Sequence, residues 1–310
     1  MRVLLAGGSG QLGRELQRCK PADIELLSLG SQELDLREAE AVAARVRGFR
    51  PQVVINAAAY TAVDRAENEP EAAFAVNGQG AANLAQAARM VGAYYLQVST
   101  DFVFDGAQSR PYLPTDRTNP LGIYGASKLA GEQLALAAYP EGVAVVRTAW
   151  LYSVFGNNFV VTMLRLMGER DSLGVVTDQV GTPTWAHGLA EALWQMAVLQ
   201  PNGILHWTDA GVASWYDFAV AIQEEAVDLR LLEREIPIHP LSTADYPTPA
   251  RRPPYSVLDK TATWATLGIK PVHWRKALRL MLIDYKAELS SSPALTKLMP
   301  FGYNKENSGA

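Results

Sequence analysis

The stretch Val3-Leu-Leu-Ala-Gly-Gly-Ser-Gly-Gln-Leu-Gly13 joins a short aliphatic run to a glycine-rich turn almost at the start of the chain. Glycines stand at positions 7, 10 and 13, and the residues that follow have a helical pattern. Glycine allows a tight turn and a close approach of the backbone to a pyrophosphate, and a helix N-terminus offers N–H donors to an anion. At a first strand–helix junction this pattern predicts a dinucleotide-binding site.

The rest of the first half repeats this alternation of strand and helix. Short aliphatic runs alternate with longer segments rich in Ala, Leu, Glu and Gln, which is typical of βαβ units, and right-handed crossovers would wind such units into a doubly wound parallel α/β sheet. The predicted strands are Val3–Gly7, Ile24–Leu29, Val53–Ala58, Tyr94–Ser99 and Val143–Thr148, and the predicted helices are Gly10–Cys19, Arg37–Gly48, Glu71–Val91 and Tyr124–Ala138.

After Trp150 prolines and aromatic residues cluster, and the pattern predicts a smaller C-terminal α/β lobe with helices at Glu191–Val198, Tyr216–Ala226 and Trp274–Leu289. The proline-rich stretch Tyr246–Tyr255 should form an extended loop. We expect residues 1–150 to form the dinucleotide-binding domain, with which later segments can interleave, residues 151–289 to form mainly a substrate-binding lobe, and residues 290–310 to form a flexible tail.

Bulk composition excludes several classes of protein. The net charge of -4 lacks the basic excess that nucleic acid binding requires, so no nucleic acid partner is expected. Cys19 is the only cysteine, which rules out an intrachain disulfide. No apolar run is long enough to cross a membrane or to serve as a signal peptide, so we expect a cytoplasmic protein without a membrane partner.

A second group of residues can carry acid–base chemistry. The fourth predicted strand ends in Ser99-Thr100-Asp101, and Tyr124 and Lys128 open a helix about twenty residues later. Residues four apart share one helix face, so the phenol and the ammonium can address one site. A nearby cation would lower the pKa of Tyr124, and Thr100 could hydrogen-bond a substrate oxygen. The alternative for this pair is an ordinary surface contact on a helix.

Together these segments resemble the family of dTDP-4-dehydrorhamnose reductases, which are extended short-chain dehydrogenases/reductases with a Rossmann fold. The resemblance spans residues 1 to about 285. It implies an oxidoreductase that uses NADPH or NADH to reduce the C4 carbonyl of dTDP-4-dehydro-L-rhamnose to dTDP-L-rhamnose. The motifs are Gly7–Gly13, Asn56–Asp64, Ser99–Asp105, Tyr124–Lys128, Arg147–Trp150 and Asp178–Thr184.

The resemblance also assigns roles to individual residues. Tyr124 would donate the proton, Lys128 would bind the nicotinamide ribose, and Thr100 would share in proton transfer. Thr100, Asp101 and Trp150 would hold the sugar, and Arg252 would lie on a loop that closes over the nucleotide. The remaining cofactor contacts would be Gly7, Gly10, Gln11, Leu12 and Gly13 around the diphosphate, Asp35 and Leu36 at the adenine end, and Ala59, Tyr60, Thr61 and Val98 in the middle of the dinucleotide.

Several points stay open at this level. Neither an acidic residue nor an arginine stands at the end of the second strand, so the sequence leaves NADH and NADPH unresolved, with NADPH slightly preferred; Asp35 is alternatively a cap for the helix at Arg37. Phe102 replaces a tyrosine common in the family. Some family members bind Mg²⁺ at a dimer interface, but only Glu191 loosely matches such a ligand, so no metal is predicted. The resemblance is compatible with a homodimer.

Two other functions fit the same motifs. One is a non-catalytic regulatory subunit similar to the β subunit of methionine adenosyltransferase, which would form a stable complex with a partner enzyme and reduce no sugar. The other is an epimerase or dehydratase acting on a different nucleotide sugar, which would retain an oxidised cofactor. The intact Thr100, Tyr124 and Lys128 favour catalysis over the regulatory function.

Overall fold

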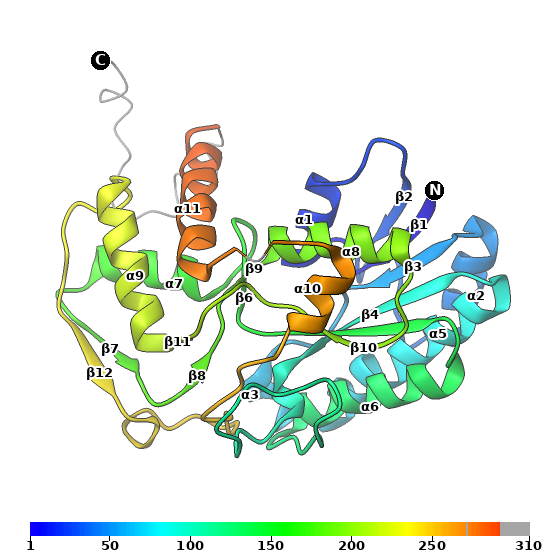
Figure 1. The fold of residues 1–310 in the computed structure, drawn as a ribbon, viewed down its shortest axis with the longest axis horizontal. Coiled ribbons are helices and arrows are strands. Elements are labelled where there is room, and N and C mark those ends of the chain that lie inside the picture. The colour runs from blue at the N-terminus through cyan, green and yellow to red at the C-terminus, as the bar shows by residue number, and fades with distance from the viewer. Residues whose placement is uncertain (271, 292–310) are drawn as a thin grey trace.

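Six parallel strands form the central sheet of the computed structural model, which describes residues 1–270 and 272–291 (Figure 1). Their order is β2-β1-β3-β4-β5-β10. The doubly wound parallel sheet predicted from the sequence is therefore confirmed. The strand order reverses beside β1, and sheets of this kind bind ligands in the crevice at that point. The strands are β1 (Arg2–Ala6), β2 (Glu25–Leu29), β3 (Val53–Asn56), β4 (Tyr94–Thr100), β5 (Val143–Thr148) and β10 (Gly203–His206).

Helices cover both faces of the sheet because successive strand residues point to opposite sides. Val3, Leu5 and Ile55 face α1 (Gln11–Arg18) and α8 (Ala186–Leu199). Leu4, Val54 and Tyr95 face the opposite way, toward α2 (Ala39–Phe49) and α5 (Gly80–Val91). Figure 1 shows α2, α5 and α6 (Ile123–Ala138) on one side of the sheet, with α1, α8 and α10 (Thr261–Leu267) on the other. The sheet is thus buried on both faces.

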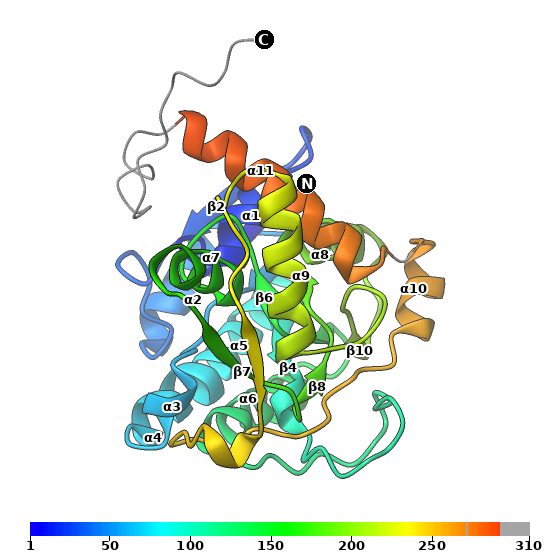
Figure 2. The same cartoon turned by 90° about the vertical axis from the view of Figure 1, so that its left-hand side faces the viewer.

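A smaller lobe with its own hydrophobic core packs beside the sheet, as predicted (Figure 2). Phe218 and Leu278 belong to this core and are fully buried. Its elements are the helices α7 (Phe159–Glu169), α9 (Trp215–Asp228) and α11 (Trp274–Ser291), the pair β7 (Leu173–Val176) with β12 (Ile238–Leu241), the pair β6 (Leu151–Tyr152) with β9 (Thr184–Trp185), and the pair β8 (Val180–Gly181) with β11 (Ala213–Ser214).

The long helix predicted over Glu71–Val91 is interrupted. The structure has α4 (Pro70–Phe74), a π-helical turn over Ala75–Gln79, and then α5. Short α3 (Val63–Ala66) precedes them. A π-helical turn inside an α-helix often marks a functional site.

Other differences concern the second half of the chain. The sequence patterns missed β10 and α7, and α8 starts at Ala186 rather than Glu191. The stretch 246–255 contains no helix and only one isolated bridge, at Tyr255, which fits the predicted extended loop. The predicted tail lies outside the described residues except for residues 290 and 291, which belong to α11. Within the described residues, no helix has the length and apolar character needed to cross a membrane.

Candidate active site

A cleft of about 710 Å³ opens along the carboxyl ends of β1 to β5. Fifteen of the seventeen site residues predicted from the sequence line this cleft, and Gly13 and Tyr60 do not. The sequence reasoning also missed part of its wall, including Arg37, Val76, Thr148 and Trp215. One concave site therefore collects residues from the glycine turn, four strand ends, α6 and the second lobe.

The glycine turn depends on close backbone contacts. Gly7 has φ +85°, and a Cβ placed there would lie 2.5 Å from the backbone nitrogen of Ala58. A Cβ at Gly13 would lie 2.2 Å from the carbonyl oxygen of Gly7, so Gly13 lets α1 pack against the turn rather than facing the cleft. Gly10 stands at the N-cap of α1 without a side-chain cap, which leaves the N–H groups of the first turn available to an anion. The geometry fits a dinucleotide diphosphate.

Asp35 and Arg37 stand together at the far end of the cleft, beyond β2. The Arg37 guanidinium donates to both carboxylate oxygens of Asp35, and its closest nitrogen lies 2.5 Å from Oδ2. This pairing holds the pKa of Asp35 below its usual value. Asp35 Oδ1 also accepts the backbone N–H of Arg37 at 3.0 Å, but α2 begins only at Ala39, so Asp35 is not the helix cap considered from the sequence.

The segment after β3 forms the wall of the middle part of the cleft. Ala57, Ala58, Ala59 and Thr61 line the cleft. Tyr60 points away, and its hydroxyl donates to Glu69 at 2.6 Å.

Asn77, from the π-helical turn, holds this segment in place. Its Oδ1 accepts the Tyr60 backbone N–H at 2.8 Å, and its Nδ2 donates to the Tyr60 carbonyl at 3.1 Å and to Ser127 Oγ of α6 at 2.9 Å. The predicted cofactor segment and the predicted catalytic helix therefore share one buried anchor, which periodicity in the sequence did not reveal.

Thr100, Tyr124 and Lys128 meet at the centre of the cleft. Thr100 ends β4, and its Oγ1 donates to Asp101 Oδ1 at 3.1 Å and accepts the Phe102 N–H at 3.2 Å. Lys128, on α6, donates to the Val98 carbonyl of β4 at 2.6 Å. Asp101 is fully buried, and its Oδ2 has no hydrogen-bond partner among the described residues.

Burial dominates the ionisation of these groups. It raises the pKa of Tyr124 to about 12, a hydrogen bond with Thr100 opposes the shift, and the charge of Asp101 adds to it. Burial lowers the pKa of Lys128 to about 8, while Glu132 opposes that shift. Burial also raises the pKa of Asp101 to about 6. The expected lowering of the Tyr124 pKa by Lys128 is therefore not seen in this structure: the phenol keeps its proton at neutral pH.

A buried ion pair lies behind Thr100, Tyr124 and Lys128 and links the elements around them. Glu132 of α6 and Arg147 of β5 are each 2% exposed, and their closest atoms are 2.7 Å apart. Ser99 Oγ, from the end of β4, donates to the same carboxylate at 2.5 Å. Through these contacts the pair links β4, β5 and α6.

Two stacked indoles form the wall on the side of the smaller lobe. Trp150 has φ +47°, and its ring stacks on Trp215 with 3.5 Å between centroids and 4° between planes. A Cβ on Gly181 would lie 2.6 Å from the Trp150 ring, so a glycine is needed there. Trp215, the first residue of α9, both packs against the core of the smaller lobe and lines the cleft.

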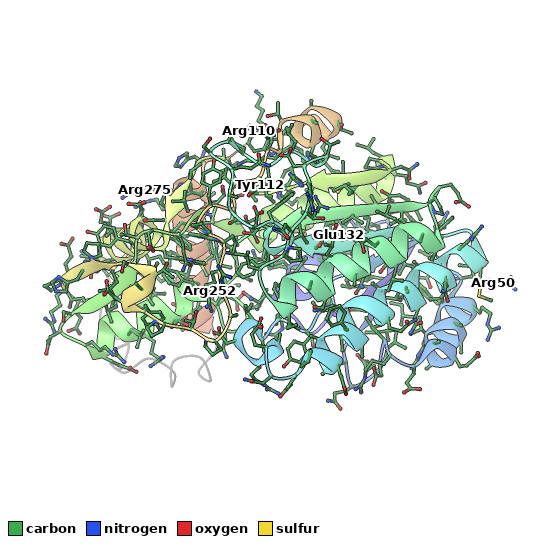
Figure 3. All side chains as sticks on the ribbon, turned by 90° about the horizontal axis from the view of Figure 1, so that it is seen from below. Arg50, Arg110, Tyr112, Glu132, Arg252 and Arg275 are labelled. Carbon is green, nitrogen blue, oxygen red and sulfur yellow. The ribbon has the colours of Figure 1, made fainter. Side chains whose placement is uncertain are left out.

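Arg252 reaches the cleft from the loop that runs between the two lobes (Figure 3). Its guanidinium is paired with Asp64 at 2.9 Å and also donates to the Ala250 carbonyl at 3.2 Å. Asp64 further accepts the Ala250 N–H at 3.2 Å. These contacts with Asp64 fix the loop to α3.

Glu191 is the residue that loosely matches the Mg²⁺ ligands of some family members. Within residues 1–270 and 272–291, no group of three His, Cys, Asp or Glu side chains could hold a metal ion. Glu191 lies 3.6 Å from His187, and the nearby Glu15 carboxylate is paired with Arg18 at 2.9 Å. A guanidinium thus supplies the positive charge beside Glu15.

Comparisons with known proteins agree over nearly the whole chain. The family model described as "RmlD substrate binding domain" matches residues 1–287. The dTDP-4-dehydrorhamnose reductase of Aggregatibacter actinomycetemcomitans is 44% identical over 286 residues, which cover 90% of this chain and 97% of that protein. The enzyme of the same name from Escherichia coli K12 is 40% identical over 291 residues, covering 91% and 97% respectively.

Solved structures give the same result. A dTDP-4-dehydrorhamnose reductase from Clostridium acetobutylicum superposes with a TM-score of 0.87 at 40% identity, covering 92% of this chain and all of the other. The Bacillus anthracis enzyme of that name, solved in complex with NADP, gives a TM-score of 0.86 at 35% identity and covers 91% and 99%. A Thermus thermophilus UDP-glucose 4-epimerase with NAD, at 22% identity and a TM-score of 0.78, shares the fold.

Proposed function

The chain belongs to the family of dTDP-4-dehydrorhamnose reductases, and from this premise we propose that it reduces the C4 carbonyl of dTDP-4-dehydro-L-rhamnose to give dTDP-L-rhamnose. The observation that carries the proposal is the meeting of Thr100, Tyr124 and Lys128 in the cleft that also contains the glycine turn. Such a site can bind a nicotinamide dinucleotide and protonate the oxygen of a carbonyl beside it.

Tyr124 supplies the proton in this mechanism. A reduced nicotinamide, when bound, supplies the hydride. As negative charge develops on the carbonyl oxygen, the Tyr124 hydroxyl donates its proton to that oxygen, and Thr100 Oγ1 hydrogen-bonds the same oxygen. Burial raises the pKa of Tyr124 to about 12 and so favours the protonated hydroxyl that this role requires. Lys128 is held against the Val98 carbonyl, where its remaining N–H groups can bind the ribose of the cofactor.

The glycine turn and the strand ends hold the dinucleotide. Backbone N–H groups around Gly10, Gln11 and Leu12 would bind the diphosphate. The adenine end would lie near Leu36 and the pair of Asp35 and Arg37. The remaining contacts proposed along the cofactor are Gly7, Ala59, Thr61 and Val98 on the cleft wall, with Gly13 and Tyr60 supporting the wall from behind.

We propose a slight preference for NADPH over NADH. Arg37 lines the cleft beside Gly30 and Ser31 and can bind a 2′-phosphate, while Asp35 can accept a hydrogen bond from an unphosphorylated ribose. Because the two side chains are paired, a 2′-phosphate would have to compete with Asp35 for the guanidinium. That competition keeps the expected preference small.

The sugar nucleotide would lie between the centre and the smaller lobe. Thr100, Asp101 and Trp150 would hold the sugar, and Arg252 would bind the diphosphate after partly exchanging its contact with Asp64. Phe102 packs edge-on against Tyr124 at 5.6 Å, so the position where the family commonly has a tyrosine contributes a ring without a hydroxyl.

Three further expectations stay predictions. We propose that residues 1–150 bind the dinucleotide, with later elements such as β10 and α8 completing that domain, and that residues 151–289 mainly bind the substrate. A homodimer and a cytoplasmic location are likewise predictions.

The decisive assay supplies dTDP-4-dehydro-L-rhamnose and follows loss of the absorbance of the reduced nicotinamide with NADPH and with NADH. Rapid oxidation with formation of dTDP-L-rhamnose supports the reductase. A folded protein that binds the dinucleotide but oxidises neither cofactor would instead favour the regulatory subunit, whose signature is a stable complex with a partner enzyme. Tightly retained oxidised dinucleotide after purification would favour an epimerase or dehydratase.

A further inference from the structure

Helix α6, which carries Tyr124 and Lys128, starts without a cap of its own. Its N-cap is Gly122, which has no side chain to accept the free N–H groups of the first turn. The acceptor comes instead from a distant part of the chain. Glu67, directly after α3, accepts the Ile123 N–H with Oε1 at 2.8 Å. A carboxylate is well suited to this place, because the helix dipole is positive there.

Gly122 leaves the room that Glu67 needs. Its backbone is extended, with φ -146° and ψ 173°, a conformation open to any residue. A Cβ at this position, however, would lie 2.5 Å from Glu67 Oε1 and 4.0 Å from the Arg251 carbonyl oxygen. The glycine is therefore explained by the approach of the carboxylate and not by backbone strain.

The same short segment also holds the loop that reaches the cleft. Asp64, three residues before Glu67, binds the Arg252 guanidinium and the Ala250 N–H. One acidic segment thus anchors both the start of α6 and the loop of Arg252, although neither Glu67 nor Asp64 lines the cleft.

We propose that Glu67 is a positioning residue for Tyr124: its carboxylate fixes the first turn of α6 and thereby sets where the phenol hydroxyl lies relative to Thr100. Tyr124 follows directly after the residue whose N–H Glu67 holds, so a shift of that turn displaces the hydroxyl. Displacement by an ångström can cost about a hundredfold in rate. This inference rests on the proposed role of Tyr124 as proton donor.

The test compares Glu67→Ala with Glu67→Gln, which keeps the accepting oxygen. We expect Glu67→Ala to lower kcat by about 10- to 100-fold, to leave NADPH binding within about twofold, and to increase amide hydrogen exchange at residues 122–128. Glu67→Gln should recover most of the kcat. Glu71→Ala is a matched control, because Glu71 is exposed and its side chain forms no hydrogen bond or ion pair within the described residues.

Gly122→Ala provides a second, independent variant, because its new Cβ displaces the same carboxylate. It should lower kcat like Glu67→Ala, and the double variant should be no worse than either single one. Unchanged kcat and unchanged exchange in Glu67→Ala would overturn the inference, as would equal losses in the Ala and Gln variants or loss of NADPH binding. If the unmodified protein itself reduced no sugar, the proposed function would fail, while the exchange data would still report on Glu67.

Discussion

Loss of the charge on Glu132 should destabilise the protein and disturb its active site together. In Glu132→Gln an accepting oxygen remains for Ser99 and Arg147, but the guanidinium loses its counter-charge in a site that is 2% exposed. Removing one partner of a buried ion pair costs about 3–5 kcal/mol. With an unfolding entropy of about 2.1 cal/mol/K per residue over 310 residues, the expected fall in Tm is about 5–8 °C.

Far-UV circular dichroism on heating measures this shift directly. Glu169→Gln is the matched control, because it makes the same change in the exposed pair of Arg165 and Glu169; such pairs contribute about 0.5 kcal/mol or less, so its Tm should fall by under about 1 °C. Replacing both Glu132 and Arg147 by Met should recover most of the loss. Equal Tm values for Glu132→Gln and the control would refute the argument.

Three further predictions concern the cleft. Burial brings the pKa of Lys128 to about 8, so its charge is lost as the pH rises through that value; kcat/KM should fall above about pH 8, and a profile flat to about pH 10 would contradict the role of its charge. Arg37→Ala should lower kcat/KM about tenfold with NADPH but change it by less than about twofold with NADH. Equal losses with both cofactors would exclude a contact between Arg37 and the 2′-phosphate. Gly13→Ala should weaken dinucleotide binding at least about tenfold, because its Cβ would clash with the Gly7 carbonyl oxygen. Gly48→Ala, which has open space around the new Cβ, should bind the dinucleotide normally and raise the free energy of unfolding by about 0.5–1 kcal/mol. Calorimetric titration with the dinucleotide distinguishes the two variants.

The first half of the fold could be predicted because local pattern and tertiary role agree there. Strands buried on both faces read as continuous aliphatic runs, and β5 was predicted with its observed ends. The pattern failed for β10, whose four residues include a glycine and a histidine and join the sheet only through β5. The π-helical turn was also not predicted, since a single inserted turn barely alters the hydrophobic periodicity of a long helix.

The site shows the same division. Residues at strand ends and on the first turns of helices were predictable, because a parallel sheet gathers them at one edge. Trp215 and Glu67 were not, because each acts through a partner distant in the chain, Trp150 in one case and Ile123 in the other. The direction of the Tyr124 pKa shift could not be predicted from the sequence either. The spacing reveals the neighbouring Lys128, but the burial of Tyr124, which outweighs the effect of the Lys128 charge, exists only in the folded protein.

Single-turnover reduction of dTDP-4-dehydro-L-rhamnose by Tyr124→Phe, with NADPH already bound, tests the central claim most directly. The variant should bind NADPH like the unmodified protein but transfer hydride about 10²- to 10⁴-fold more slowly, because the developing alkoxide lacks its proton donor. Hydride transfer at a rate near that of the unmodified protein would contradict the account, since another group would then have to supply the proton.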